Sequence, residues 1–366
     1  SNLMRYIMTT NFANLSVEIM ARSTHVHPSV FGIVVPEHQM DKVKPFQGFD
    51  SANPFSAFVP KQNDDYVFEA YLRSSVLMWI NYPQNQSLWI SGPTGCGKTS
   101  VVEQVAARLN WPVMKTTASQ DLDINNLIGG LRLQCNELTG DTKTVFVHGP
   151  LTLAYKYGLI FLLDEYDQLD PSCANAFNAI LEGGNLVIPE TNEVIKQHPN
   201  FRFVATANSI GQGDFTGVYG GVKTLNVANL DRYMFITADY MPKETETKLI
   251  TKYIPDTKVA EKFVDVANMI RGLFVGKNIT GEIDTSVNTN SAKLPDGVLP
   301  DTRLSVTCST RSLVAWLDRY SMMKAAKMPR ALLTAFDYQI GNRASADDKK
   351  SLHLIVEAVF GSEALK

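Results

Sequence analysis

Cysteine is scarce in this sequence, and its few thiols are not grouped. The 366 residues include four cysteines that form neither a CxxC pair nor a Cys/His zinc spacing, namely Cys96, Cys135, Cys173 and Cys308. This spacing excludes the usual structural zinc motifs. We therefore expect reduced thiols in a cytoplasmic protein.

The sequence also lacks an excess of one charge and lacks a long apolar run. Its 34 basic and 37 acidic residues give a net charge of -3, so no global attraction to nucleic acid or to an anionic membrane is expected. No stretch approaches the ~18 consecutive apolar residues of a membrane helix, and the N-terminus lacks the order of a signal peptide. These absences weigh against a DNA motor and a membrane protein, although a locally basic pore stays compatible with them.

The chain does contain enough apolar sequence for a large core, because 45% of its residues are hydrophobic. Its length favours more than one domain. Residues 1–60 hold short β-type runs, such as residues 31–36, broken by prolines, and predict an appended N-terminal region and linker. Residues 61–242 predict an α/β domain, and residues 243–366 predict a helical lid with a polar insertion at about 276–302.

Hydrophobic spacing places the expected elements within these regions. In the α/β region the expected strands cover residues 87–91, 113–116, 159–163 and 201–207. The expected helices there cover residues 66–81, a segment beginning near residue 98, and residues 172–182. The lid is expected to hold helices at 243–253, 258–271, 310–326, 330–341 and 346–360. Apolar strands that alternate with helices predict a parallel sheet covered on both faces.

The segment GPTGCGKT over residues 92–99 fits the phosphate-binding pattern GxxxxGK[ST], and it lies between an expected strand and an expected helix. Glycines let backbone N–H groups face phosphate oxygens at the start of the helix. Lys98 is then expected to reach the β and γ phosphates, and Thr99 to bind Mg²⁺. The alternative is a glycine-rich turn with a surface lysine, but the strand and helix around it favour ATP and Mg²⁺ as cofactors. The residues predicted to contact nucleotide are Gly92, Pro93, Thr94, Gly95, Cys96, Gly97, Lys98, Thr99 and Ser100.

Two adjacent acids end an apolar strand in the string LIFLLDE. Carboxylates at the end of a buried strand either face solvent or hold a cation. With the phosphate loop upstream, we expect Asp164 to hold Mg²⁺ and Glu165 to orient the water that attacks the γ phosphate. Asp167 and Asp170 follow in a loop and receive no predicted role.

The next expected strand ends in Asn208, whose amide can donate to a phosphate or to the attacking water. An asparagine in this position is otherwise a turn residue. After the two preceding motifs, a γ-phosphate sensor is the favoured interpretation.

Four strings together point to a family: GPTGCGKTS, FLLDEYD, HPNFRFVATANSIGQGDFTGVYGG and NLDRYMFITADYMP. They resemble the MoxR-related AAA+ ATPases, and within that clade the CobS-like subunits of aerobic cobaltochelatases. The likeness runs from about residue 60 to about residue 320. It implies an AAA+ P-loop core in which Lys98 and Thr99 bind phosphate and Mg²⁺, Asp164 and Glu165 form the Walker B pair, and Asn208 is the first sensor.

The resemblance also implies a homo-oligomeric ring, commonly a hexamer, with ATP between neighbouring subunits. Arg232 in the string LDRY resembles an arginine finger that reaches the neighbour's site, where a guanidinium stabilises charge on the γ phosphate. Arg311 resembles the second sensor at the start of a lid helix. For each arginine, a surface ion pair is the alternative.

Two further segments resemble loops that face the pore or a partner in this family. Residues 128–151 resemble an insertion beside the second helix, and residues 183–198 predict a β-hairpin. The mixed charge of that hairpin, which includes Glu190, Glu193 and Lys196, provides no stripe for tracking phosphates and disfavours a helicase.

The leading hypothesis is an ATP-driven ring motor that remodels a partner complex, acting with a protein that carries a von Willebrand A domain. A narrower form is a chelatase motor that drives insertion of Co²⁺ into a corrin-type ring on another subunit. The alternative hypothesis is a nucleic-acid-associated or defence-system AAA+ ATPase. A third is a nucleotide-binding scaffold without turnover, against which Glu165 argues, because hydrolysis needs this carboxylate more than binding does.

Overall fold

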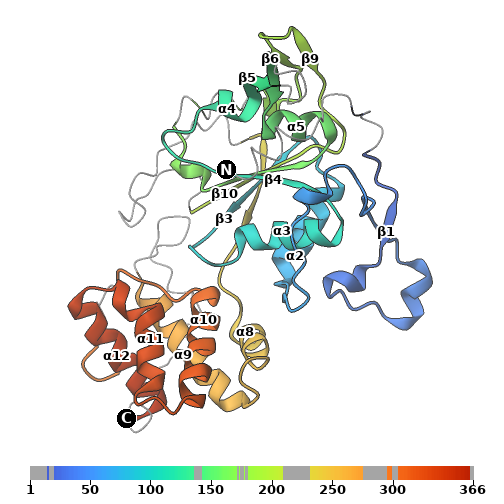
Figure 1. Cartoon of the computed structure of the whole chain (residues 1–366). Coiled ribbons are helices and arrows are strands. Elements are labelled where there is room, and N and C mark those ends of the chain that lie inside the picture. Colours follow the sequence, from blue (N-terminus) through green and yellow to red (C-terminus); the bar gives the residue numbers. More distant parts are fainter. Residues whose placement is uncertain are drawn as a thin grey trace. The chain divides into compact units, whose positions relative to one another are not determined.

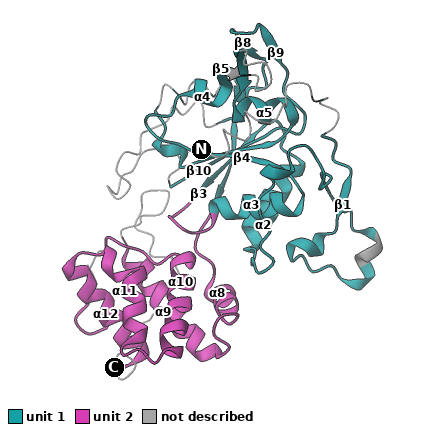
Figure 2. Ribbon diagram, viewed as in Figure 1, with its two compact units in different colours: residues 1–91, 98–213, 221–237 teal, residues 92–97, 214–220, 238–366 magenta. Residues whose placement is uncertain are grey.

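The computed structural model of the chain describes residues 15, 20–135, 142–170, 173, 177, 180–208, 231–274, 295–298 and 304–362 (Figure 1). It divides the chain into two compact units (Figure 2). Unit 1 comprises residues 1–91, 98–213 and 221–237, and unit 2 comprises residues 92–97, 214–220 and 238–366. Most of the helix expected over 172–182 and most of the insertion expected at 276–302 lie outside the described residues. Among the helices of the described ranges, none has the length and apolar run needed to cross a membrane.

Unit 1 is built on a five-stranded parallel sheet in the order β11-β3-β10-β7-β4. The strands are β3 (Ser87–Ser91), β4 (Val113–Thr117), β7 (Ile160–Asp164), β10 (Arg202–Ala207) and β11 (Tyr233–Thr237). Every residue of β3 and β10 is buried, as near-continuous apolar strands covered on both faces require. The predicted α/β class with a parallel sheet is confirmed.

The register of the three inner strands aligns their carboxyl ends. Ser91 of β3 pairs with Ala207 of β10, and Ala205 of β10 pairs with Leu163 of β7. Strand β3, the first strand of this sheet along the chain, is followed by β4 on one side, whereas its neighbour β10 is followed by β11 on the other side. The connections from β3 and β10 therefore leave in opposite directions. In open α/β sheets the crevice outside the carboxyl ends at such a point is where ligands bind.

Helices α2 (Ala70–Asn81), α3 (Lys98–Arg108) and α5 (Pro150–Tyr157) pack on the sheet or on each other, with α5 against β4 and β7 and α2 against β11. Helix α2 starts at Ala70, four residues later than the sequence predicts. The reason is capping: the Glu69 carboxylate accepts hydrogen bonds from the backbone N–H groups of Tyr71 and Leu72, and such a cap ends the preceding extended segment.

The N-terminal segment of unit 1 differs from the sequence expectation. The β-type run expected over residues 31–36 is wrong: Pro28–Phe31 forms a 3-10 turn that ends at Gly32 with φ +71, and residues 33–36 form no strand. The strands of this segment are instead β1 (Thr24–Val26) and β2 (Phe46–Gly48), which pair antiparallel. The segment packs directly on the core, since Phe49 donates its N–H to the Leu109 carbonyl at 2.8 Å and its ring meets Trp111 edge-on at 5.1 Å.

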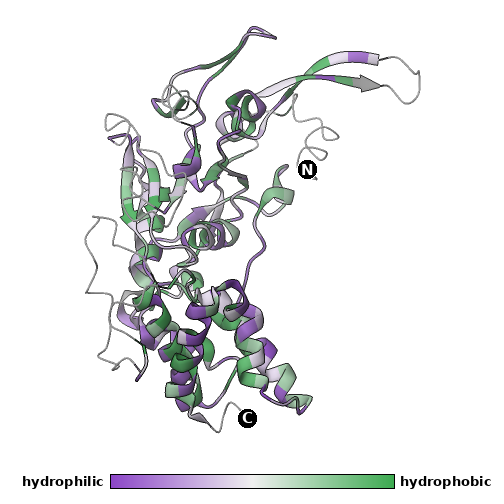
Figure 3. Ribbon diagram, turned by 90° about the vertical axis from the view of Figure 1, so that its left-hand side faces the viewer, coloured by the Kyte–Doolittle hydropathy of each residue, from purple (hydrophilic) through white to green (hydrophobic). Residues whose placement is uncertain are grey.

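Two antiparallel hairpins extend unit 1. One consists of β5 (Gly129–Cys135) and β6 (Thr142–His148), preceded by the short helix α4 (Ile124–Ile128). The β5-β6 ribbon projects from the rest of the unit at the upper right of Figure 3. The other consists of β8 (Leu186–Ile188) and β9 (Glu193–Ile195), which confirms the hairpin predicted at residues 183–198.

Unit 2 is helical, as the lid pattern predicts. Its helices are α8 (Lys243–Ile250), α9 (Thr257–Leu273), α10 (Thr310–Ala325), α11 (Ala331–Gln339) and α12 (Ala346–Phe360). They are amphipathic, with hydrophobic and hydrophilic residues along each helix in Figure 3. Their apolar faces meet around Trp316, whose ring contacts Phe263 at 4.5 Å and Phe336 at 5.0 Å between centroids.

Gly48→Ala should detach the N-terminal segment from the core. A Cβ at this position would lie 2.5 Å from the Leu109 carbonyl oxygen, which is backbone and cannot move aside. We expect a loss of about 1–3 kcal/mol of unfolding free energy, measured by chemical denaturation. Gly130→Ala is the matched control, because its Cβ would meet nothing closer than the Arg132 guanidinium at 3.6 Å. Equal stability of the two variants would contradict the docking contact.

Candidate functional site

Four of the predicted site residues meet at the carboxyl edge of the sheet in unit 1. The Lys98 ammonium donates to Asn208 Oδ1 at 3.1 Å, and the Thr99 hydroxyl donates to Asp164 Oδ1 at 2.9 Å. Lys98 and Thr99 begin α3, whereas Asp164 and Asn208 end or follow β7 and β10. The arrangement brings together a cation, a hydroxyl, a carboxylate and an amide from sequence positions up to 110 residues apart.

Asp164 has further partners that the sequence does not single out. The Thr206 hydroxyl of β10 donates to the same carboxylate oxygen, and the Lys115 ammonium of β4 lies 3.8 Å from the other oxygen. Lys115 also contacts Glu103 of α3 at 3.1 Å. A hydroxyl and a carboxylate are the hard oxygen donors that suit Mg²⁺, so Thr99 and Asp164 fit the predicted metal. The available sequence signal for Thr206 was a hydroxyl residue near the end of a mostly apolar strand, and the structure buries it completely.

Asp167 is a second residue that the sequence left without a role. Its carboxylate is 1% exposed and accepts the backbone N–H of Asn208 at 2.9 Å, which orients the residue that faces Lys98. Its other oxygen, Oδ1, is buried without a hydrogen-bond partner among the described residues. Burial raises the pKa of Asp167, while the hydrogen bond from Asn208 and the charge of Lys98 oppose that rise.

Glu165 differs from its neighbours in both backbone and exposure. It follows β7 directly, its side chain is exposed, and its φ of 57 and ψ of 40 place it in the left-handed region. That conformation is uncommon for a residue with a side chain and is concentrated at functional sites. The turn ends the strand abruptly and separates the exposed Glu165 from the partly buried Asp164.

The first part of the glycine-rich loop, residues 92–97, belongs to unit 2. Gly92 has φ +155 and a Cβ there would lie 2.1 Å from the Ala238 carbonyl oxygen. Gly95 has φ +79 and a Cβ there would lie 2.3 Å from Ser309 Cβ. Both positions therefore require glycine. Cys96 is buried.

Arg232 lies at the opposite edge of the same sheet. It precedes β11, and its carbonyl accepts the N–H of Ser87, the first residue of β3. The carboxyl end of β3 is four residues further on, or roughly 13 Å at about 3.3 Å per residue. Arg232 forms an ion pair with Glu182 and lines a pocket of about 560 Å³ that also includes His198 and Arg202.

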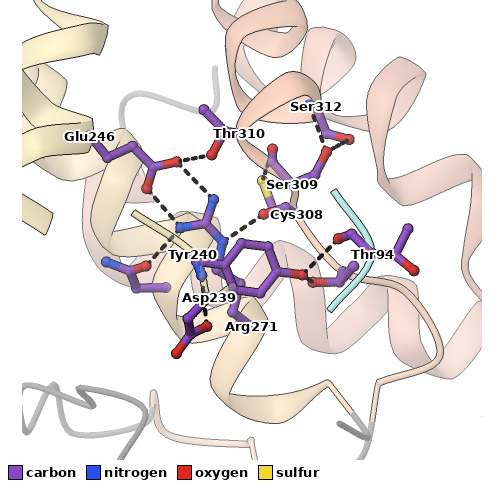
Figure 4. Close-up of polar contacts among 11 residues, drawn as sticks. Thr94, Asp239, Tyr240, Glu246, Arg271, Cys308, Ser309, Thr310 and Ser312 are labelled. Atoms are coloured by element: carbon purple, nitrogen blue, oxygen red, sulfur yellow. Dashed lines mark hydrogen bonds and ion pairs between the residues drawn. The ribbon is translucent and has the colours of Figure 1, made fainter. Parts of the chain in front are cut away.

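Arg311 lies in the first turn of α10 and is exposed. Other residues of unit 2 form a polar cluster, which we call the lid cluster: Tyr240, Glu246, Arg271, Cys308, Ser309 and Thr310 (Figure 4). Its centre is a buried ion pair in which the Arg271 guanidinium makes two hydrogen bonds to Glu246, at 2.7 and 2.9 Å. Burial alone would lower the pKa of Arg271, but the hydrogen bonds and charge of Glu246 raise it above the ordinary value.

A second polar group joins the two hairpins of unit 1. The Glu193 carboxylate of β9 lies 2.7 Å from His148 Nε2 of β6 and accepts from the Lys156 ammonium of α5 at 2.9 Å. Four aliphatic side chains on these hairpins are more than half exposed: Leu131, Leu133, Val187 and Val194. The Glu193 carboxylate therefore links both hairpins to α5, while the hairpins expose these apolar side chains.

The fold and the carboxyl-edge cluster define a P-loop nucleotide-binding protein of the α/β class. Residues 87–232 match the AAA domain of the dynein-related subfamily. The aerobic cobaltochelatase subunit CobS of Sinorhizobium sp is 31% identical over 232 residues, which cover 61% of this chain and 69% of that protein. The chain therefore belongs to the CobS-like branch of the MoxR-type AAA+ ATPases.

Other relatives are less complete matches. An uncharacterized protein of Staphylococcus epidermidis is 33% identical over 184 residues, and the match covers 50% of this chain and 64% of that protein. An uncharacterized protein of Staphylococcus haemolyticus is 34% identical over 158 residues, and the match covers 43% of this chain and 57% of that protein. Each of these two matches spans less than two thirds of the relative. A solved structure of a RuvB mutant from Thermotoga maritima aligns at 13% identity with a TM-score of 0.46, over 83% of this chain and 86% of that chain.

The contribution of Glu193 to stability should depend on pH. Burial favours a higher pKa, but the hydrogen bonds from Lys156 and His148 dominate and hold the pKa of Glu193 below its ordinary 4.5. The unfolded state then binds the proton more readily, so the contribution is full above pH 4.5 and is lost as pH falls through the lowered value.

Glu193→Gln should therefore lower Tm at pH 7, and the difference from the parental protein should shrink below pH 4.5, measured by circular dichroism. Glu190→Gln, an exposed carboxylate in the same hairpin, is the control and should leave Tm nearly unchanged throughout. A constant Tm difference at every pH would show that packing, not ionisation, carries the effect.

Proposed function

We propose that this chain is the ATP-hydrolysing motor subunit of a homo-oligomeric ring, commonly a hexamer, that remodels a partner complex. The observation that carries the proposal is the convergence of Lys98, Thr99, Asp164 and Asn208 at the carboxyl edge of the sheet. A surface lysine after a glycine-rich turn would have no reason to lie beside a strand-end asparagine. Lys98 is only 9% exposed, which also argues against a solvent-facing role for this lysine.

The roles of the residues follow from their chemistry. Residues 92–100 surround the phosphates with backbone N–H groups, and the Lys98 ammonium neutralises the β and γ phosphates. Thr99 and Asp164 would hold Mg²⁺, which would offset the negative charge of the phosphates. Glu165 accepts a proton from the attacking water, and Asn208 orients the γ phosphate. Water adds to the γ phosphorus as the bond to the β-phosphate oxygen breaks, which yields ADP and phosphate.

Arg232 acts in this proposal on the nucleotide of a neighbouring subunit. Its place at the amino edge of the sheet supports that assignment, since the phosphate loop of its own chain follows the opposite end of β3. Arg311 is proposed to contact the nucleotide as the second sensor. Its exposed position in the first turn of α10 leaves the guanidinium available.

The partner and the substrate are the narrower part of the proposal. The similarity to CobS supports a cytoplasmic motor that acts with a von Willebrand A domain protein, and a role in cobalt chelation. In that role the chain would supply mechanical work from hydrolysis, and another subunit would insert Co²⁺. The exposed aliphatic side chains of the two hairpins offer a surface for contact with such a partner.

Glu165→Gln should retain ATP binding and lose hydrolysis. The amide keeps the size of the side chain but cannot accept the proton of the attacking water, so we expect kcat to fall by roughly 10²-fold or more. The dissociation constant for ATP should stay within a few-fold, measured by calorimetry beside a phosphate-release assay. Glu261→Gln, an exposed residue of α9, is the control. Hydrolysis by Glu165→Gln at the parental rate would remove Glu165 from the mechanism.

The same ATP-locked variant tests the partner. Affinity purification followed by mass spectrometry should recover a von Willebrand A domain protein, and a large chelatase-like subunit would support the cobalt role. The ATPase rate should rise with that partner and not with DNA or RNA. Recovery of nucleic-acid-processing proteins, or stimulation by nucleic acid, would overturn the remodelling proposal.

Arg232→Ala should bind ATP but hydrolyse it roughly 10³-fold more slowly, the scale of a lost arginine finger. Mixing it with Glu165→Gln subunits should restore part of the activity. In a mixed ring some sites combine an intact Glu165 from one chain with an intact Arg232 from its neighbour. Arg319→Ala, an exposed arginine of α10, is the control. Two inactive variants that stay inactive when mixed would argue that Arg232 does not act between subunits.

A further inference from the structure

The lid cluster contacts the phosphate loop at the peptide bond between Thr94 and Gly95. The Tyr240 hydroxyl donates to the Thr94 carbonyl at 3.1 Å (Figure 4). It also lies 3.2 Å from the Thr307 hydroxyl. A tyrosine has a single O–H, so Thr307 is the donor in that second contact. All of these residues belong to unit 2.

The Tyr240 ring is held in place by the buried ion pair. The Arg271 guanidinium stacks over the ring at 4.3 Å from its centroid. The same guanidinium is fixed on its other sides, because it makes two hydrogen bonds to Glu246 of α8 and donates to the Cys308 carbonyl at 2.7 Å. The Arg271 and Glu246 side chains are 1% and 0% exposed. The hydroxyl is therefore presented from a rigid support shared by α8, α9 and the segment before α10.

Ser309 restrains the same peptide from a second direction. Its Cβ occupies the space into which a side chain at position 95 would point, and its hydroxyl caps α10 by accepting the Ser312 N–H at 3.1 Å. Thr310, the next residue, donates to Glu246 at 2.7 Å. The Glu246 carboxylate therefore holds both Arg271, which packs on the Tyr240 ring, and Thr310, which follows Ser309.

Peptide geometry gives this contact a consequence for phosphate binding. In a trans peptide the C=O and the next N–H point in opposite directions, and the described residues contain no cis bond. Fixing the Thr94 carbonyl against Tyr240 therefore fixes the Gly95 N–H on the other side of the peptide. Glycine at φ +79 otherwise has wide conformational freedom, so an unrestrained peptide at this point would rotate.

We propose that Tyr240 is a positioning residue that preorganises the Thr94–Gly95 peptide of the phosphate loop for nucleotide, and that the Arg271–Glu246 pair links this peptide to the lid helices. The inference rests on the proposed ATP binding and adds a residue that no motif assigns. Tyr240 acts through the loop backbone and need not touch the nucleotide. Preorganisation strengthens binding because the free loop has less freedom left to lose.

Tyr240→Phe tests the proposal, because it removes the hydroxyl and keeps the ring under Arg271. We expect the dissociation constant for ADP with Mg²⁺, measured by calorimetry, to rise between about twofold and tenfold, the range of one net hydrogen bond. KM for ATP should rise by a similar factor. The Tm of the nucleotide-free protein should change by no more than about 1 °C, while the Tm increase produced by saturating ADP should become smaller.

Two controls separate positioning from a general loss of structure. Tyr338→Phe removes the hydroxyl of an exposed tyrosine in α11 and should leave ADP affinity unchanged. Thr307→Val removes the hydroxyl that donates to Tyr240 and keeps the contact to Thr94, so its ADP affinity should stay near the parental value.

Parental ADP affinity in Tyr240→Phe would overturn the inference. So would a loss of affinity matched by an equal loss of nucleotide-free stability, because that pattern indicates damage to the fold. If the parental chain itself failed to bind ADP or ATP, the proposed function would fail as well, which distinguishes the two failures.

Discussion

The parallel register of β3, β7 and β10 is the constraint on which the rest of the site depends. Parallel strands in register end at the same edge of the sheet, so strand pairing alone brings together the residues that follow them. Ser91 pairs with Ala207, and Ala205 pairs with Leu163, which brings the starts of the phosphate loop, the Asp164 turn and Asn208 to one edge. These buried and mostly apolar strands hold the register, because a slip by one residue would turn every side chain to the opposite face.

The same register separates Arg232 from the cluster that it is proposed to serve. Strand β11 runs parallel to β3, so the residue before β11 lies at the amino edge, where Arg232 accepts the Ser87 N–H. A residue on that edge cannot reach the carboxyl edge of its own sheet. For this reason we propose that Arg232 acts on the nucleotide bound by a neighbouring subunit.

The Arg271–Glu246 pair stands out within the helical unit. Removing two charges from water costs several kcal/mol per ion, and well-packed apolar residues are often as stable. The pair is satisfied by Cys308, Thr310 and Asn268, which limits that cost. The pair gives Tyr240 and the glycine-rich loop a support with fixed direction, which an apolar pair could not provide.

Much of the fold and of the candidate site could be predicted from local patterns in the sequence. The glycine pattern, the apolar strands ending in Asp164, Glu165 and Asn208, and the helical periodicity of the C-terminal region predicted the fold class. Backbone preference and hydrophobic spacing are properties of neighbouring residues, so a sequence displays them. Where local capping competes with periodicity, as at Glu69 and Pro28, the predicted boundaries or strands were wrong.

Contacts between distant segments were decided only by the tertiary structure. Strand pairing brings Thr206 and Lys115 close to the predicted site, and the turn after β7 brings Asp167 there. Of the three, Lys115 and Asp167 carry no pattern of their own in the sequence. Tyr240 and Arg271 likewise meet across 31 residues because α8 and α9 pack together. Hydrogen-bond partners of this kind depend on which elements pack, and packing depends on the whole apolar surface. The sequence by itself thus determined the chemistry available to the protein, while the fold decided which groups share a site.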